Sequence, residues 1–214
     1  MSMTLVDIAT NGFRMDQYWA LPNYRTFLDF IQCLQVLDIV FAALKVTNNS
    51  VLTTLLQIFS RVAMVLSIFP LLKAPPSPTD LICLGIFLCM LNWSMIEVIR
   101  FGFYYSKADN ADSGLSKLFG HLRYNVFIFA YILGVAGELI TIYYGYQELV
   151  KADEAGILPP WTVRMPNAWN FVFEFRSFLY VSPLMYLGGF PGLYMHMWAQ
   201  RAKFYGAAKK GKTQ

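Results

Sequence analysis

The apolar segment 123–146, RYNVFIFAYILGVAGELITIYYGY, contains one carboxylate, Glu138, and a tyrosine seven residues before it, Tyr131. Seven residues are about two turns of an α-helix, so both side chains share a helical face about 10 Å apart along the axis. They cannot touch at that distance, but they can flank a small reacting group. An acid in an apolar segment is costly and usually functional, and a carboxyl beside a phenol suits acid–base chemistry.

Two glycines, Gly134 and Gly137, lie between the tyrosine and the acid. Small residues let helices approach closely in membranes. The same missing side chains also make room for a substrate. The sequence leaves both interpretations open, and they are compatible with each other.

The composition places these residues in a membrane protein. Of the 214 residues, 57% are hydrophobic and 14% are charged, whereas about a quarter of a soluble domain is charged. Most basic residues flank apolar segments or lie at the C-terminus, which argues against nucleic-acid binding. Cys33, Cys83 and Cys89 lie in apolar segments without metal-ligand spacing, so we expect neither a disulfide framework nor a metal site.

About 20 apolar residues are needed for one transmembrane helix. The sequence predicts an all-α, polytopic membrane helix bundle with five spans, at 27–46, 51–72, 81–104, 124–146 and 171–198. The last contains Pro183 and Pro191, so we expect a kink or two separate helices. Two longer loops are predicted at 105–122 and 147–170.

Other charged residues also lie in the predicted spans. Glu97 and Arg100 are three residues apart and can pair on one helix, while Glu174 and Arg176 lie near a span end. Arg61 lies mid-span and needs a partner. The preceding helix offers Asp38 as one candidate, and a ligand phosphate is the alternative.

The orientation follows from the excess of Lys and Arg in cytosolic loops. The side of the 105–122 loop carries Lys45, Lys107, Lys117, Arg123, Arg201, Lys203, Lys209, Lys210 and Lys212, against Arg14, Arg25, Lys73, Lys151 and Arg164 on the other. This predicts a cytosolic C-terminus. The tail KKGKTQ has the lysine spacing of a retrieval signal, which predicts the endoplasmic reticulum membrane. We divide the chain into an N-terminal segment 1–26, a membrane domain 27–205 and a basic tail 206–214.

The segment YILGVAGELITIY (131–143) resembles the very-long-chain (3R)-3-hydroxyacyl-CoA dehydratases, also called protein tyrosine phosphatase-like A proteins. Further similar segments follow the family's order: LLQIFSRVAMV (55–65), NWSMIEVIRFGFY (92–104), RYNVF (123–127), MPNAWN (165–170) and GLYMHMWAQRAKF (192–204). The resemblance covers residues 31–205. Six segments in one order are far more specific than any one of them.

The resemblance implies dehydration of a long-chain or very-long-chain 3-hydroxyacyl-CoA to the trans-2-enoyl-CoA during fatty-acid elongation. It implies no cofactor, and it implies a catalytic pair that falls on Tyr131 and Glu138. Candidate substrate-binding residues are Arg61, Arg100, Arg123, Tyr124, Gly134 and Gly137. Implied partners are the acyl-CoA substrate, membrane lipid and the other elongation enzymes, namely a condensing enzyme and two reductases.

The chain departs from the family pattern in three ways. Ile132 stands where the family has proline, and Asp38 where it tends to have glutamate. The family has six spans, and residues 1–26 do not supply the first one. Two rival functions are a non-catalytic scaffold of an elongase complex and a small transporter or proton relay through Asp38, Arg61 and Glu138. The relay predicts internal symmetry, which the sequence lacks.

Overall fold

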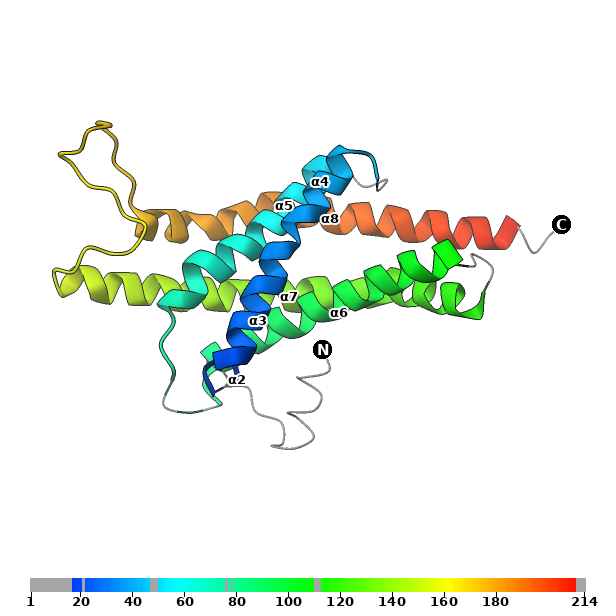
Figure 1. The fold of residues 1–214 in the computed structure, drawn as a ribbon, viewed down its shortest axis with the longest axis horizontal. Helices are drawn as coiled ribbons and strands as arrows, with labels where there is room; N and C mark the ends of the chain where they lie inside the picture. Colours follow the sequence, from blue (N-terminus) through cyan, green and yellow to red (C-terminus); the bar gives the residue numbers. More distant parts are fainter. Residues whose placement is uncertain are drawn as a thin grey trace. The chain divides into compact units, whose positions relative to one another are not determined.

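The structure is a computed structural model that describes residues 17–20, 22–46, 50–75, 77, 79–109 and 113–210 (Figure 1). Its α-helices are α2 (Gln17–Ala20), α3 (Pro22–Leu34), α4 (Val36–Ala43), α5 (Val51–Ala63), α6 (Leu81–Asp109), α7 (Gly114–Glu154) and α8 (Phe175–Lys210). A π-helical turn η1 (Met64–Ile68) and a 3₁₀ turn η2 (Phe69–Leu71) follow α5. In these ranges the only β-pairing is an isolated bridge between Val163 and Phe173. The predicted all-α class is confirmed.

Among the described residues, four helical segments are long and apolar enough to cross a membrane: Arg25–Ala43, Thr54–Leu71, Leu81–Asp109 and Gly114–Glu154. They correspond to the first four predicted spans, and the chain is a multi-pass membrane protein. The fifth predicted span lies in α8, which is long enough but is not among these four. That span stays a prediction.

Helix α8 continues without interruption through both of its prolines, so the predicted alternative of two separate helices is wrong. Pro183 has no N–H to donate to the carbonyl of Leu179. The hydroxyl of Ser182 donates to that carbonyl instead, at 2.9 Å. Because the freed acceptor is satisfied locally, the helix can continue.

Both predicted loops are shorter than the sequence indicated. Helix α6 extends to Asp109 and α7 begins at Gly114, so much of 105–122 is helical. At its other end α7 extends to Glu154, well into the predicted 147–170 loop. A helix can continue past the hydrocarbon boundary into water, where hydropathy no longer reports it. The 41 residues of α7 span about 60 Å, twice the bilayer core of about 30 Å.

The chain divides into two compact units, and α6, α7 and α8 each continue from one unit into the other. Unit 1 comprises Met1–Ile86 and Glu138–Pro183, while unit 2 comprises Phe87–Gly137 and Leu184–Gln214. The first and last residues of the chain lie outside the described ranges, and so does Lys212 of the predicted retrieval signal.

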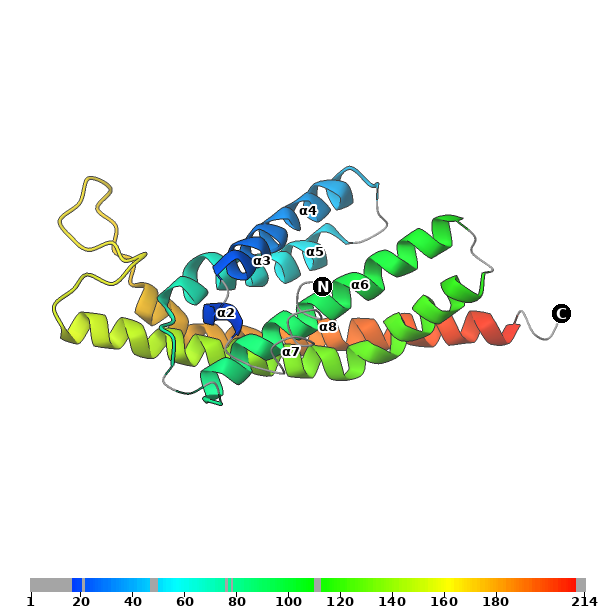
Figure 2. The same cartoon turned by 60° about the horizontal axis from the view of Figure 1, so that its bottom comes forward.

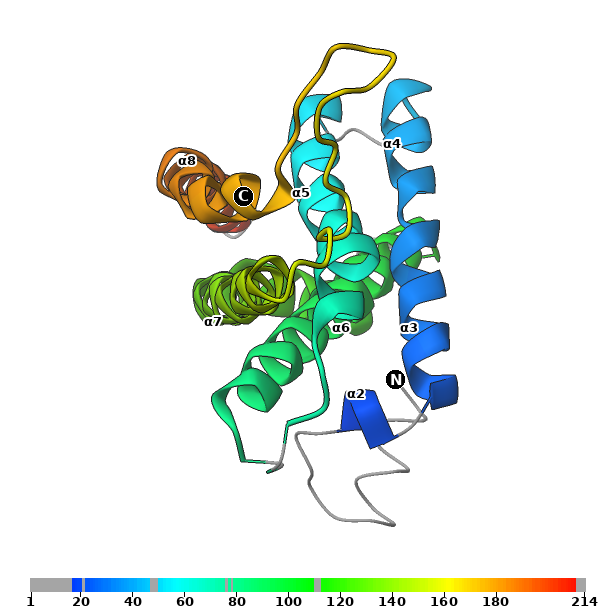
Figure 3. The same ribbon diagram turned by 90° about the vertical axis from the view of Figure 1, so that its left-hand side faces the viewer.

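Unit 1 contains the N-terminal helices. Helices α3 and α4 follow one another and run beside α5 (Figures 2 and 3). The ring of Tyr18 packs edge-on against Phe69 at 5.3 Å between centroids, and the indole of Trp19 donates to the carbonyl of Leu72 at 3.3 Å. These contacts attach the short helix α2 to the end of the second span.

Glycines mark the closest helix contacts. In unit 1, a Cβ on Gly85 of α6 would lie 2.6 Å from Ile140 Cγ2 of α7, closer than van der Waals contact allows. In unit 2, a Cβ on Gly102 of α6 would lie 2.4 Å from the ring of Phe119. At these positions glycine is required for α6 and α7 to pack along each other in opposite directions.

We predict that Ser182→Ala destabilises the protein by about 1 kcal/mol, because it leaves the Leu179 carbonyl without its donor. In a Pro183→Ala background the restored backbone N–H serves that carbonyl, so the same substitution should cost almost nothing. Thermal unfolding of the wild type, the two single variants and the double variant in detergent measures this coupling. Equal costs in both backgrounds would contradict the proposed role of the Ser182 hydroxyl.

Candidate active site

The predicted catalytic pair lies on one unbroken helix. Tyr131 and Glu138 both belong to α7, which continues through Ile132, so the helical spacing of the pair is as the sequence predicts. Tyr131 is half-buried, whereas Gly134, Gly137 and Glu138 are buried. Glu138 is only 7% exposed. The helix therefore presents a phenol, two glycines and a buried carboxyl in succession.

In unit 2 the ring of Tyr131 packs among aromatic side chains. Phe127, one turn earlier, meets Tyr131 edge-on with 6.2 Å between centroids. Phe127 in turn contacts Tyr194 and Trp198 of α8, each at 5.8 Å. Edge-to-face aromatic pairs have a preferred geometry, so this packing limits the orientations available to the Tyr131 phenol.

Asn92 of α6 lies opposite Gly134 and was not predicted as a site residue. A Cβ on Gly134 would lie 3.7 Å from Asn92 Cβ, an ordinary contact. Asn92 is 1% exposed, and its Nδ2 donates to the Leu88 carbonyl at 2.7 Å. Its Oδ1 has no hydrogen-bond partner among the described residues. Exchanging the amide atoms would place two oxygens together, so the free group is an acceptor.

In unit 1, Glu138 begins a tightly packed part of α7. Its carbonyl accepts a hydrogen bond from Thr141 Oγ1 at 2.8 Å, and Thr141 is fully buried. Ile140 and Thr141 both lie against Gly85 of α6. The backbone that carries the acid is therefore held by close packing.

Arg61, a candidate for substrate binding, belongs to a polar chain in unit 1. Its Nη1 donates to Gln35 Oε1 at 2.9 Å, and Gln35 Nε2 donates to Gln32 Oε1 at 3.0 Å. Both glutamines are buried. This chain ties α5 to the junction of α3 and α4, which favours a structural role for Arg61.

The remaining candidates lie in unit 2. Arg100 pairs with Glu97, as predicted. Arg123 lies over the rings of Phe103 and Tyr104, at 5.0 and 5.1 Å from their centroids. The carbonyl of Tyr124 accepts a hydrogen bond from the Arg201 guanidinium at 3.0 Å. The structure thus brings Arg123 into contact with α6 and Tyr124 into contact with α8.

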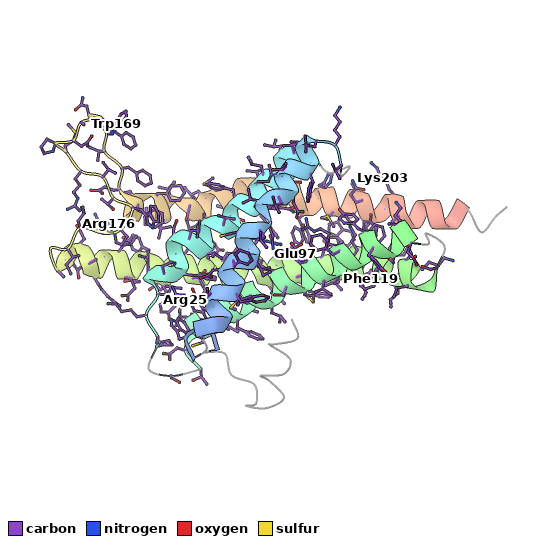
Figure 4. All side chains as sticks on the ribbon, in the orientation of Figure 1. Arg25, Glu97, Phe119, Trp169, Arg176 and Lys203 are labelled. Atoms are coloured by element: carbon purple, nitrogen blue, oxygen red, sulfur yellow. The ribbon has the colours of Figure 1, made fainter. Side chains whose placement is uncertain are left out.

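Glu174 and Arg176, which lie near the end of a predicted span, both belong to an ion-pair network of unit 1. Asp153 accepts from Arg164 at 2.6 Å and from Arg176 at 2.8 Å, and Arg164 also lies 4.0 Å from Glu174. The hydrogen bond to Asp153 raises the pKa of Arg164 above its ordinary value. This network ties the end of α7 to the loop whose tip carries Trp169 (Figure 4).

The described ranges contain no group of three His, Cys, Asp or Glu side chains that could hold a metal ion. None of the three cysteines forms a disulfide bond.

A model of the protein tyrosine phosphatase-like protein family, PTPLA, matches residues 32–207. The chain belongs to this family. The match includes every residue considered above as a candidate for catalysis or substrate binding. No solved structure matches the chain.

Three curated relatives of this PTPLA protein are named very-long-chain (3R)-3-hydroxyacyl-CoA dehydratases. The protein hpo-8 of Caenorhabditis elegans is 34% identical over 202 residues, covering 94% of this chain and 86% of the relative. Dehydratase 1 of Mus musculus is 34% identical over 82% of this chain and 58% of its own length. Dehydratase 2 of Homo sapiens is 32% identical over 86% of this chain and 67% of its own length.

We predict that Gly134→Ala leaves the melting temperature nearly unchanged, because the added methyl only reaches ordinary contact with Asn92. Gly102→Ala is the matched substitution on α6, where the methyl would meet the Phe119 ring. It should cost about 1–3 kcal/mol of stability. Thermal unfolding of the two variants in detergent measures both effects. A loss at Gly134 equal to that at Gly102 would show that Gly134 serves close packing.

Proposed function

We propose that this chain dehydrates long-chain or very-long-chain (3R)-3-hydroxyacyl-CoA to the trans-2-enoyl-CoA. The observation that carries the proposal is the preserved Tyr131–Glu138 spacing on one continuous helix in a member of the PTPLA family. The dehydratase names of relatives that cover most of this chain support it.

The reaction removes a proton from C2 and the hydroxyl from C3. The electron pair of the C2–H bond forms the C2=C3 double bond, the C3–O bond breaks, and the hydroxyl leaves as water after it gains a proton. The thioester acidifies C2, but hydroxide is a poor leaving group, so both a base and an acid are needed. Two groups about two turns apart on a helix can serve the two neighbouring carbons of one substrate.

We assign proton removal from C2 to Glu138 and proton donation to the leaving hydroxyl to Tyr131. A carboxylate has lone pairs that can accept the C2 proton, and a phenol has an O–H that it can donate to the leaving hydroxyl. The packing of Phe127 against Tyr131 helps to hold the donor in place.

Asn92 and Gly134 fit the same reaction. The 3-hydroxyl is the hydrogen-bond donor that distinguishes this substrate from its enoyl product, and Asn92 Oδ1 is a buried acceptor with no partner among the described residues. Gly134 lies next to Asn92 and between the two catalytic positions, without a packing requirement for glycine. We infer that the missing side chain leaves room for the substrate carbons.

The cellular setting follows from the same proposal. A very long acyl chain is lipid-like, and burying it among apolar helices contributes about 0.8 kcal/mol per methylene. We propose that the protein works in the endoplasmic reticulum membrane with its C-terminus in the cytosol, beside the condensing enzyme and the reductases of elongation. The distribution of Lys and Arg along the sequence supports this orientation.

We predict that the purified protein converts a long-chain 3-hydroxyacyl-CoA to the enoyl-CoA, and that Tyr131→Phe and Glu138→Gln each lower kcat by at least about a hundredfold. Each substitution removes a proton donor or acceptor and keeps the shape of the side chain. The enoyl product is quantified by mass spectrometry, and unchanged melting temperatures establish folding. Tyr143→Phe, at an exposed tyrosine of the same helix, is the matched control. An inactive but folded wild type would instead support the scaffold function.

A further inference from the structure

Two segments of the family pattern, RYNVF (123–127) and GLYMHMWAQRAKF (192–204), meet in unit 2 around Arg201 of α8. Its Nε donates to the Tyr124 carbonyl and its Nη2 donates to Asn125 Oδ1, both at 3.0 Å. Asn125 also donates to the Tyr205 hydroxyl at 2.6 Å. These bonds fix the guanidinium of Arg201 against the beginning of α7.

Aromatic rings contact this arginine and also Arg123, the residue that precedes Tyr124 on α7. The Arg201 guanidinium lies 5.2 Å from the Trp198 ring centroid and 5.1 Å from that of Tyr205. Arg123 lies within 6 Å of the rings of Phe103, Tyr104 and Tyr124. The rings of Tyr124 and Phe204 lie 4.6 Å apart and join the two sets. We call these residues the Arg123–Arg201 cluster: Phe103, Tyr104, Arg123, Tyr124, Asn125, Trp198, Arg201, Phe204 and Tyr205.

The contacts of the two arginines leave them without an acidic partner among the described residues. Their partners in the described part of the chain are aromatic rings, a carbonyl and an amide, all neutral. A guanidinium has five N–H donors, and the bonds of Arg201 to α7 use two of them. Both arginines are partly exposed. Within the described part of the chain they therefore combine a positive side chain without an acidic partner, remaining N–H donors and contacts that hold their position.

The surroundings are also basic. Lys107 near the end of α6, Lys117 near the start of α7 and Lys203 on α8 are exposed, and Lys107 lies 5.8 Å from the Phe103 ring centroid. Asp109 is the one acidic side chain described at these helix ends. Arginine binds phosphate with two parallel hydrogen bonds and stacks on planar rings.

We propose that the Arg123–Arg201 cluster binds the phosphorylated adenosine end of the acyl-CoA substrate. This rests on the proposed function, which makes a CoA thioester the substrate. Arg123 and Arg201 bind the phosphates, and the aromatic rings of the cluster stack on the adenine. Arg123 precedes Tyr131 by eight residues of α7, about 12 Å along the helix. The flexible pantetheine arm bridges that separation between the phosphates and the thioester.

The first test is direct binding of adenosine 3′,5′-bisphosphate, the CoA end without pantetheine, to the full-length protein in neutral detergent. We expect saturable binding to the wild type that weakens about tenfold or more in Arg201→Gln and Arg123→Gln, because each loses charged hydrogen bonds to phosphate. Lys151→Gln removes an exposed positive charge of unit 1 and should bind normally. No binding to the folded wild type, or equal binding by all variants, overturns the proposal. This readout does not depend on turnover.

The second test compares a 3-hydroxyacyl-CoA with the matching 3-hydroxyacyl-pantetheine thioester. Arg201→Gln should raise KM for the CoA thioester about tenfold and leave both kcat and the pantetheine kinetics unchanged. Equal losses with both thioesters would show that Arg201 only holds α7 and α8 together, and the dehydratase function would stand. A wild type that binds the nucleotide but turns over neither thioester would contradict the dehydratase function. The nucleotide-binding site itself would still be supported.

A lipid headgroup phosphate could occupy the same arginines, and competition separates the two sources. We expect adenosine 3′,5′-bisphosphate to displace the CoA substrate in the wild type, whereas phosphatidylserine in mixed micelles with the detergent displaces it poorly because it offers no adenine. If phosphatidylserine displaces the substrate in an Arg201-dependent manner and the nucleotide does not, the cluster is a lipid site and the proposal is wrong.

Discussion

In the hydrocarbon core of a membrane there is no water to satisfy backbone N–H and C=O groups, so each must find a partner within the protein. This constraint favours an unbroken helix in the part of α7 that lies in the hydrocarbon core, and α7 extends from Gly114 to Glu154. In α8 the Ser182 hydroxyl serves the carbonyl that Pro183 leaves without a backbone donor, and that helix also continues. Because α7 is unbroken, the positions of Tyr131 and Glu138 on it follow from helix geometry alone.

The polar side chains of the spans follow the same rule. Gln35 accepts a hydrogen bond from Arg61 and donates one to Gln32. Glu97 pairs with Arg100. Asn92 Oδ1 is one of a few buried side-chain atoms that have no hydrogen-bond partner among the described residues. A buried acceptor without a donor costs free energy, and in the proposed reaction the substrate hydroxyl offsets that cost. Asn92 lies beside Gly134, where packing does not require glycine.

Much of this organisation could be predicted from the sequence, because hydropathy reports burial in lipid and helix periodicity fixes the spacing of Tyr131 and Glu138. The extension of α7 to Glu154 could not, because a helix beyond the bilayer leaves no hydropathy signal. The π-helical and 3₁₀ turns after Ala63 depend on how the chain accommodates Pro70. Asn92 could have been identified from the sequence, because it places an amide side chain in the apolar segment 81–93. The contact of Arg201 with Tyr124 and Asn125 depends on packing between distant segments, which no local pattern reports.

The central claim, reversible elimination of water by Tyr131 and Glu138, is tested most directly by isotope exchange. The purified protein is incubated with a 3-hydroxyacyl-CoA in water enriched in heavy oxygen, and label in the 3-hydroxyl group is followed by mass spectrometry. The account predicts incorporation by the wild type, alongside enoyl-CoA, and none by the folded double variant Tyr131→Phe/Glu138→Gln. The absence of exchange in the folded wild type, or exchange that persists in the double variant, would contradict it.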